Sequence, residues 1–385
     1  MLSEKHESLS PDELMAGSPP LIGPALLETV TPMFAYVGCY TSPERQGHGE
    51  GINVYRIDPG VERWTHVQLV KGLFNPSFLA FDRSERFLYS VHGDDEHITA
   101  FHIDNKTGTL GMINQQSIGG KNGVHLSIDP SNRFIVTANY SSGTVAVVPR
   151  NRDGSLAPLC DLVVLSGTPG PNVIEQAFSH PHHVPFHRNG RFIVVPDKGL
   201  DKIFVLRLDI ENERLMPNDP PAVSTRPGAC PRHIDFHPHK PFAYVNNELH
   251  SSITAYLFDE DCGELKPVQE VSTIPPEFTG KNKSAEIIVA PSGRFIYCSN
   301  RGHDSIVIYG IDEMTGLLTL VGWESARGRT PRFITMNPTG EMLYAANQNS
   351  DAISSFLIDP STGKMVGTGQ VMETGSPSCI IFKVK

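Results

Sequence analysis

Short runs of alternating hydrophobic and polar residues recur along the chain, and they come in pairs joined by a tight turn. The turns are rich in Pro, Asn, Ser and Gly, as in PSFLAFDRSERFLYSV and SAEIIVAPSGRFIYCSN. Alternation with a period of two around such a turn is typical of a β-hairpin. Six hairpins of this kind begin at Pro76, Gly123, Pro181, Pro231, Ser284 and Pro331. The segments between them show no extended helical period, so the pattern predicts an all-β protein.

A second signature follows several of these hairpins: an aspartate, a glycine four residues later, and then an apolar residue. It occurs at Asp104 and Gly108, Asp259 and Gly263, Asp312 and Gly316, and Asp359 and Gly363. The carboxylate accepts hydrogen bonds from the turn backbone, and glycine takes the positive φ that such a turn needs. Each unit is therefore predicted to hold four antiparallel strands in roughly 45–55 residues, the size of one β-propeller blade.

The two ends of the chain supply the parts of one more blade. Strand-like segments follow Met33, and the last run, Pro377–Val384, matches the first strand of the other units. Pairing of the two ends would close the ring and remove both exposed sheet edges. The predicted fold is a seven-bladed β-propeller over residues 33–385, closed by its N- and C-terminal strands. Residues 1–32 fit no blade and are predicted to form a tail or strap.

Composition and charge narrow the classes of partner. The chain has 385 residues and a formal net charge of -10, which argues against nucleic-acid binding because that requires clustered cations. No apolar run reaches the roughly 18 residues of a membrane helix, and the N-terminus lacks the features of a secretory signal. We therefore expect a cytoplasmic protein without a membrane partner. A few local arginines still allow a small anionic substrate.

Hairpin geometry predicts which side chains share one mouth of the ring. Residues equidistant from a hairpin turn lie side by side, and a turn near Lys240 places Arg232 beside Glu248. The same reasoning on the other hairpins brings further polar residues to this mouth: His125, His182, Glu286, Arg301, Arg332 and Gln348. Two long connections, residues 166–180 and 275–283, must emerge there too, and long loops on a rigid scaffold commonly carry binding sites.

This set of residue types suits acid–base chemistry on a small anion. Arginines bind carboxylate or phosphate groups, and a buried glutamate or histidine transfers protons. Arg232 and Glu248 are also compatible with a purely structural ion pair. His180, His182, His183 and His187 invite comparison with a metal site. However, alternate residues of a strand face opposite ways, so only His180 and His182 point together, and no metal or other cofactor is predicted.

At these residues the sequence resembles the seven-bladed β-propeller lactonase family. This family includes bacterial propeller-type 6-phosphogluconolactonases and the fungal 3-carboxy-cis,cis-muconate lactonizing enzyme. The passages that carry the resemblance are HPHHVPFHRNGRFIVVPD, GACPRHIDFHPHKPFAYVNNEL and SNRGHDSI. The resemblance implies a metal-free active site with four catalytic residues, His182, Arg232, Glu248 and Arg301, and it leaves His183 as an alternative to His182.

Three functional hypotheses follow. The first is hydrolysis of a sugar-acid lactone, above all 6-phosphogluconolactone, in which Arg232 and Arg301 hold negative charge while Glu248, assisted by His182, activates water. The predicted substrate-binding residues are His125, His183, Glu286, Arg332 and Gln348. The second hypothesis is lactonization of a carboxylated muconate by the same residues. The third is a propeller that only binds a ligand or protein.

Overall fold

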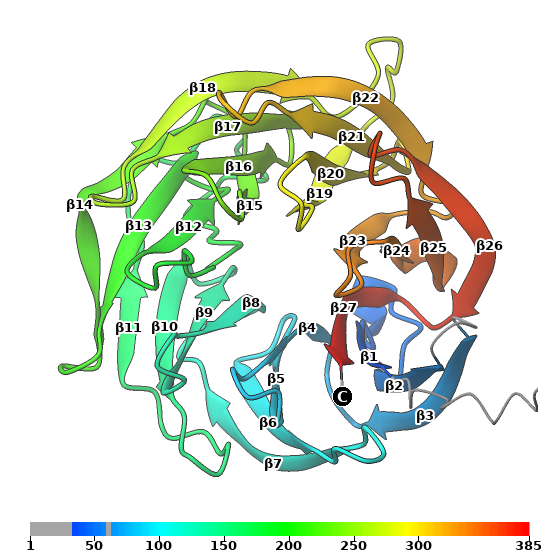
Figure 1. The fold of residues 1–385 in the computed structure, drawn as a ribbon. Helices are drawn as coiled ribbons and strands as arrows, with labels where there is room; N and C mark the ends of the chain where they lie inside the picture. The colour runs from blue at the N-terminus through cyan, green and yellow to red at the C-terminus, as the bar shows by residue number, and fades with distance from the viewer. Residues whose placement is uncertain (1–32, 59–62, 385) are drawn as a thin grey trace, which may run out of the picture.

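The fold is a ring of β-sheets (Figure 1). A computed structural model describes residues 33–58 and 63–384, so the predicted tail or strap of residues 1–32 lies outside the described residues. Within these ranges the strands form seven antiparallel sheets, and each sheet is one blade. The predicted all-β, seven-bladed propeller is confirmed.

The blades follow one another along the chain. Blade one contains β27 (Pro377–Val384), β1 (Met33–Cys39), β2 (Gly51–Asp58) and β3 (Arg63–Lys71). Blade two contains β4 (Pro76–Phe81), β5 (Phe87–His92), β6 (His97–Ile103) and β7 (Leu110–Ser117). Blade three contains β8 (Gly123–Ile128), β9 (Phe134–Asn139), β10 (Thr144–Pro149) and β11 (Asp161–Val164). Blade four contains β12 (Ile193–Asp197), β13 (Lys202–Asp209) and β14 (Arg214–Ser224).

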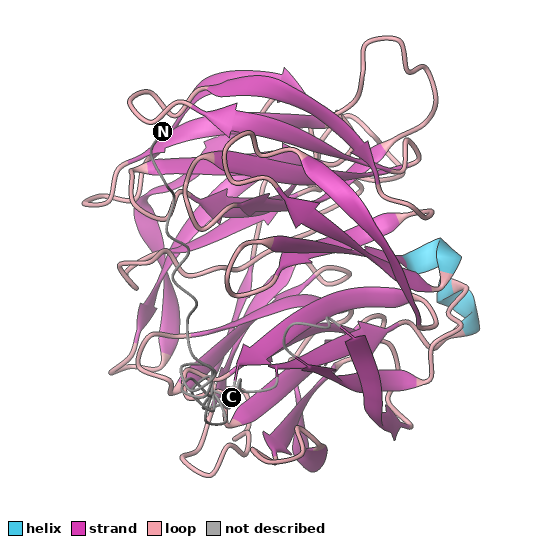
Figure 2. Cartoon of the chain, turned by 45° about the vertical axis from the view of Figure 1, so that its right-hand side comes forward, coloured by secondary structure: helices cyan, strands magenta, loops and turns pink. Residues whose placement is uncertain are grey.

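The remaining blades repeat the four-stranded order. Blade five contains β15 (Pro231–Phe236), β16 (Phe242–Asn247), β17 (Ser252–Phe258) and β18 (Leu265–Ser272). Blade six contains β19 (Lys283–Val289), β20 (Phe295–Arg301), β21 (Ser305–Ile311) and β22 (Leu318–Ser325). Blade seven contains β23 (Pro331–Met336), β24 (Met342–Asn347), β25 (Ala352–Ile358) and β26 (Met365–Glu373). Two short 3-10 helices, η2 (Pro43–Arg45) and η3 (Gln348–Ser350), lie on one side of the ring (Figure 2).

Blade four departs from the predicted four strands. Its innermost segment forms no continuous strand and is joined to β12 by two isolated bridges, Pro181 to Asp197 and Phe186 to Ile193, and by a few further hydrogen bonds. Proline has no N–H to donate, so Pro181 and Pro185 interrupt the ladder. Blade three compensates, because the Val184 N–H donates to His125 Nδ1 and Ser127 Oγ donates to the Val184 carbonyl.

Blade one is closed by the two ends of the chain, as the sequence predicts. Strand β27 pairs with β1 in antiparallel register from Met33 opposite Val384 to Cys39 opposite Pro377. Both strands therefore have a neighbour, and the ring has no open seam at this point.

The Asp-to-Gly turns join neighbouring blades. In several blades a buried tyrosine of the second strand donates its hydroxyl to the glycine carbonyl of the next blade's turn, for example Tyr36 to Gly108 at 2.8 Å and Tyr244 to Gly316 at 3.0 Å. Gly108 has a φ of 74°, and a Cβ there would lie 2.3 Å from the Phe34 ring. The glycine is thus required both by the turn and by the packing between blades.

A β-bulge at the start of the inner strands directs side chains toward the centre of the ring. In blade five Pro231 pairs with Asn247 but His233 pairs with Asn246, which leaves Arg232 as the extra residue. The same shift occurs at the corresponding position of blades two, three and seven. A bulge reorients the extra side chain, and here it gives one mouth of the ring its lining.

Candidate active site

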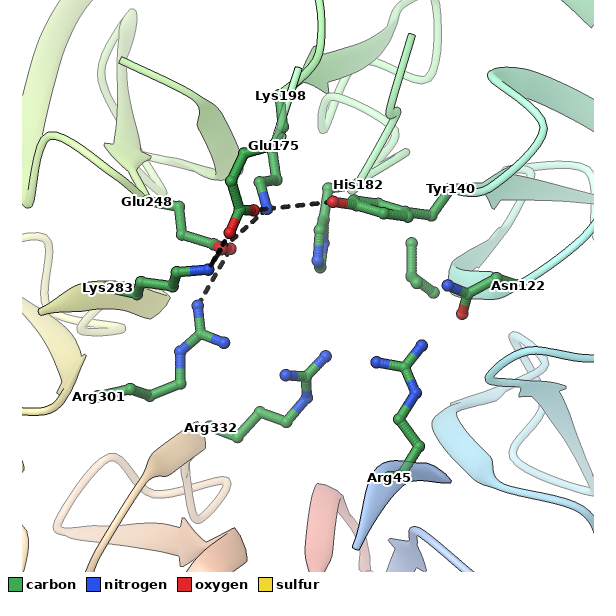
Figure 3. Close-up of a pocket in the computed structure, with 11 residues that line it drawn as sticks. Arg45, Asn122, Tyr140, Glu175, His182, Lys198, Glu248, Lys283, Arg301 and Arg332 are labelled. Atoms are coloured by element: carbon green, nitrogen blue, oxygen red, sulfur yellow. Dashed lines mark hydrogen bonds and ion pairs between the residues drawn. The ribbon is translucent and has the colours of Figure 1, made fainter. Parts of the chain in front are cut away.

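A cavity of about 210 Å³ lies at the mouth where the inner strands begin (Figure 3). The residues that line it come from five blades, both long loops and η2. They are Arg45, Asn122, Val124, Tyr140, Glu175, His182, Lys198, Glu248, Lys283, Arg301 and Arg332.

Two repeated blade positions supply most of this lining. The bulge position contributes Val124 and Arg332, and the residue after Pro181 in blade four contributes His182. The position at the end of the second strand contributes Tyr140, Lys198, Glu248 and Arg301. The site is therefore assembled from equivalent points of successive blades, each with a different side chain.

Glu248 is the centre of a buried charge cluster on one wall. The Glu248 carboxylate lies 2.8 Å from Lys198 Nζ, 3.1 Å from Arg232 Nε and 3.0 Å from an Arg301 terminal nitrogen. Glu248 and Arg232 are each 3% exposed. The Arg232 side chain reaches the cluster from just below the cavity and also donates to the Ala285 carbonyl. One buried carboxylate thus pairs with three cations, of which Lys198 and Arg232 are buried and Arg301 is 14% exposed.

This cluster keeps Glu248 ionised. Burial alone would raise the pKa of Glu248, but the charges of Lys198, Arg301 and Arg232 outweigh burial and hold that pKa well below its usual range. Burial opposes the charge of Lys198, but Glu248 raises the Lys198 pKa. A carboxylate held this strongly in its ionised form is a poor proton acceptor at neutral pH.

The opposite wall presents guanidinium groups toward the cavity. Figure 3 shows the side chains of Arg332 and Arg45 pointing inward across from Glu248. Arg45 pairs with Asp94 at 2.5 Å. Among the described residues Arg332 has no hydrogen-bond or ion-pair partner, and its guanidinium lies 5.2 Å from the centre of the Tyr40 ring. An unpaired guanidinium on a cavity wall is suited to an anionic ligand.

The two long loops meet beside Glu248, at the mouth that the sequence predicts for them (Figure 3). Lys283 Nζ lies 2.5 Å from Glu175 Oε1, which joins residues 166–180 to the start of β19. Within the described part of the chain, five cations and two carboxylates line the cavity. The cavity is therefore positive, although the whole chain has a net charge of -10.

His182 is a buried, neutral histidine on the cavity wall. Burial and then the charge of Arg232 hold the pKa of His182 well below its usual range. Its Nδ1 lies 3.1 Å from His233 Nε2. Its other ring nitrogen, Nε2, has no hydrogen-bond partner among the described residues. A neutral imidazole with one nitrogen anchored and the other free can accept a proton from water.

Below the cavity a layer of rings and one carboxyl group fills the channel. His125 contacts Phe78 and His183, with ring centres 4.2 and 4.0 Å apart. His183 stacks on His233, and His233 Nδ1 lies 2.7 Å from Glu286 Oε1. This layer separates the cavity from a second space of about 400 Å³ that opens where the inner strands end.

The structure brings most of the predicted site residues together, at two depths. His182, Glu248, Arg301 and Arg332 line the cavity, and Arg232 contacts Glu248 from beneath it. His125, His183 and Glu286 belong to the deeper layer and do not line the cavity. Gln348 lies outside it, in an adjacent depression with His48 and Arg329. The structure therefore gives no support to Gln348 as a substrate-binding residue.

Symmetry about each turn does not include the bulges, so the pairings that it predicts are wrong by one to three residues. Symmetry places Arg301 opposite Glu286 and His125 opposite Asn139, but Arg301 lies opposite Lys283 and His125 opposite Ala138. Hairpin symmetry brings Asp197 or Lys198 to this mouth, and the structure places Lys198 in the cavity. Sequence reasoning missed several other site residues: Arg45, Asn122, Tyr140, Glu175, Lys283 and His233. Tyr140 had a detectable signal, because it directly follows Asn139 at the end of a second strand, as Glu248 follows Asn247 in blade five.

In the described residues no group of three or more His, Cys, Asp or Glu side chains has an arrangement that could hold a metal ion. No helix within those residues is long and apolar enough to cross a membrane.

Fold and cavity together define a β-propeller with a positively charged cavity at one mouth. The chain belongs to the family of 7-bladed β-propeller lactonases, whose model matches residues 34–382. It is 35% identical to 6-phosphogluconolactonase of Bacillus subtilis over 79% of this chain and 84% of that protein. It is 31% identical to a protein of the same name from Formosa agariphila, over 77% and 84%. The structure of a periplasmic gluconolactonase from Pseudomonas aeruginosa superposes with a TM-score of 0.85 at 32% identity, covering 92% of this chain and 99% of that one.

Proposed function

We propose that the protein hydrolyses the lactone of a phosphorylated sugar acid, 6-phosphogluconolactone or a close relative, in the cavity at this mouth. The observation that carries the proposal is a positive cavity with a neutral histidine on its wall, His182, whose Nε2 is free. The names of the related proteins support the same reaction class and favour hydrolysis over lactonization of a muconate.

Different cations of the cavity bind different groups of the substrate. Arg332 and Arg45 bind the phosphate. Among the described residues Arg332 has no ion pair or hydrogen bond that phosphate binding would have to break. Arg301 lies between Arg332 and Glu248 and faces the lactone carbonyl. A guanidinium fixed in place before the reaction stabilises the oxyanion that forms when water adds to that carbonyl.

The geometry changes the roles expected for Glu248 and His182. Glu248 keeps its charge and holds Lys198, Arg232 and Arg301 in position, so it is an organiser of cations rather than the general base. His182 Nε2 takes the proton of the attacking water and returns it to the ring oxygen that leaves. Burial and Arg232 hold the pKa of His182 low, so the buried imidazolium beside Arg232 forms only transiently during the reaction.

A panel of lactones tests the proposal. The purified protein is mixed with 6-phosphoglucono-δ-lactone, glucono-δ-lactone and a carboxymuconate, and rates are corrected for spontaneous ring opening. We expect turnover of the phosphorylated lactone that falls by roughly a hundredfold or more in His182→Asn. Substitution of a histidine outside the cavity, His48→Asn, is the control and leaves the rate unchanged. Absence of turnover above the spontaneous rate on every lactone would refute the proposal.

A further inference from the structure

His182 is the first member of a hydrogen-bonded row that runs down the channel. His182 Nδ1 lies 3.1 Å from His233 Nε2, and His233 Nδ1 lies 2.7 Å from Glu286 Oε1. All three side chains are buried, with exposed fractions of 5%, 2% and 5%. The row thus connects the cavity wall to a carboxyl group in the deeper layer.

The row has two tautomeric forms. With Glu286 ionised, His233 donates to Glu286 through Nδ1–H, His182 donates to His233 through Nδ1–H, and His182 Nε2 faces the cavity as a lone pair. With Glu286 protonated, every hydrogen bond is reversed and His182 presents an N–H to the cavity. The first form accepts a proton from water, and the second form donates one.

We propose that Glu286, acting through His233, stores the proton that His182 takes from water during lactone hydrolysis. This inference rests on the proposed function and adds two positioning residues to it. Glu286 and His233 do not touch the substrate; they set the tautomer of His182 and hold its proton.

The proton and bond changes balance in each half of the reaction. The water oxygen bonds to the lactone carbonyl carbon, the water proton moves to His182 Nε2, the Nδ1 proton of His182 moves to His233, and the Nδ1 proton of His233 moves to Glu286. When the tetrahedral intermediate collapses, the bond from carbon to ring oxygen breaks. The three proton shifts then run backwards and deliver a proton to the leaving ring oxygen, so no oxidant or further reactant is needed.

Burial favours storage on Glu286 over an imidazolium. Burial and the charges of Arg232 and Arg332 hold the pKa of His233 well below its usual range. Burial raises the pKa of Glu286 to about 7. Its Oε2 atom is buried without a hydrogen-bond partner in the described structure, which disfavours the ionised form. Within this row the proton is therefore most stable on Glu286, as the neutral carboxylic acid.

The charges around Glu286 come from several blades. The titratable groups that face it are Arg232, His233 and Asp235 on β15, His183 beside β12, Arg332 on β23, Cys298 on β20 and Cys379 on β27. Glu286 also lines the space of about 400 Å³ on the far side of the layer. Solvent at that mouth can therefore set its protonation while substrate occupies the other mouth.

The test compares pH profiles of wild type, Glu286→Gln and Asp235→Asn on 6-phosphoglucono-δ-lactone. Asp235 is a matched control, because burial raises its pKa to about 7 as well, but its carboxylate accepts only the backbone N–H groups of Phe236 and Val289. In wild type we expect kcat to fall as pH drops through about 7, because protonated Glu286 removes the base form. Asp235→Asn keeps this limb but moves it to somewhat lower pH, because it removes a negative charge that faces Glu286. In Glu286→Gln we expect kcat to fall at least about tenfold and this pH limb to disappear, whereas Glu286→Asp restores the limb.

An infrared measurement checks the row without turnover. The carboxylic-acid C=O band of Glu286 is followed against pH in the Asp235→Asn background, with Glu286→Gln added as the reference. We expect a band that titrates near pH 7 and that Glu286→Gln abolishes. An unchanged kcat and pH limb in Glu286→Gln, or no such band, would overturn the relay. If the wild type has no lactonase activity but the band is present and titrates, the result contradicts the proposed function and not the hydrogen-bonded row.

Discussion

Replacing Glu248 by Gln removes the one carboxylate that balances three buried cations. The change keeps the shape of the side chain but leaves Arg232 and Arg301 without an ion-pair partner and Lys198 with only the more distant Glu175, at 3.7 Å. At separations near 3 Å, each contact is worth about 5 kcal/mol of gross attraction at an effective dielectric constant of about 20. Desolvation offsets much of that, and removal of one partner from a buried ion cluster costs about 3–5 kcal/mol net.

This cost predicts a measurable fall in Tm. Unfolding entropy of about 2.1 cal/mol/K per residue gives about 0.8 kcal/mol/K for a chain of 385 residues. A loss of about 3–5 kcal/mol therefore lowers Tm by about 4–6 °C. The assay is thermal unfolding at pH 7 and fixed scan rate, with kcat measured on the same samples. We also expect kcat to fall by roughly a hundredfold, because Arg301 and Lys198 lose their fixed positions.

Glu175→Gln is the matched control. It makes the same chemical change next to the same Lys198, which lies 3.7 Å away, but the Glu175 side chain is 27% exposed. Partly exposed pairs contribute about 0–1 kcal/mol, so Tm changes by no more than about 1 °C. Equal Tm shifts in the two variants would show that Glu248 does not balance the buried cations and would refute the reasoning.

Two further predictions concern Arg332 and Asp235. Arg332→Gln raises KM for 6-phosphoglucono-δ-lactone by about tenfold or more, the effect of a lost charge-assisted hydrogen bond, and leaves KM for glucono-δ-lactone nearly unchanged; equal effects on both substrates in steady-state kinetics would place the phosphate elsewhere. The raised pKa of Asp235, about 7, means that this residue stabilises the fold fully only below its unfolded pKa and loses that contribution as pH rises through 7. As pH rises from 5 to 7, the Tm of Asp235→Asn therefore increases relative to the Tm of wild type. A difference in Tm that stays constant over that range would contradict a raised pKa of Asp235.

The sequence predicts the ring well because each blade repeats the same local pattern. The alternation around each hairpin, the Asp-to-Gly turns and the matching ends at Met33 and Pro377 all reflect contacts within one blade or between neighbours. Blade four is the exception, since Pro181 and Pro185 lack the N–H groups that its inner strand would need. The position of this segment depends on its hydrogen bonds with blade three, and such contacts between blades do not follow from the pattern within one blade.

The site is less predictable because it depends on positions that differ from blade to blade. Hairpin symmetry finds Arg232 and Glu248, but it does not show that Lys198 and Arg301 share the same carboxylate. Nor does it distinguish the cavity wall from the layer beneath it, because the bulge shifts each inner strand by one residue. His233 is missed for this reason: it follows the bulge residue Arg232 and faces the deeper layer.

The most direct test of the account is a crystal structure of the protein with 6-phosphogluconate, the product of the proposed reaction. We expect the phosphate to lie against Arg332 and Arg45, and the new carboxylate to lie within hydrogen-bonding distance of His182 Nε2 and Arg301. Product bound at the opposite mouth, or with its carboxylate away from His182, would contradict it.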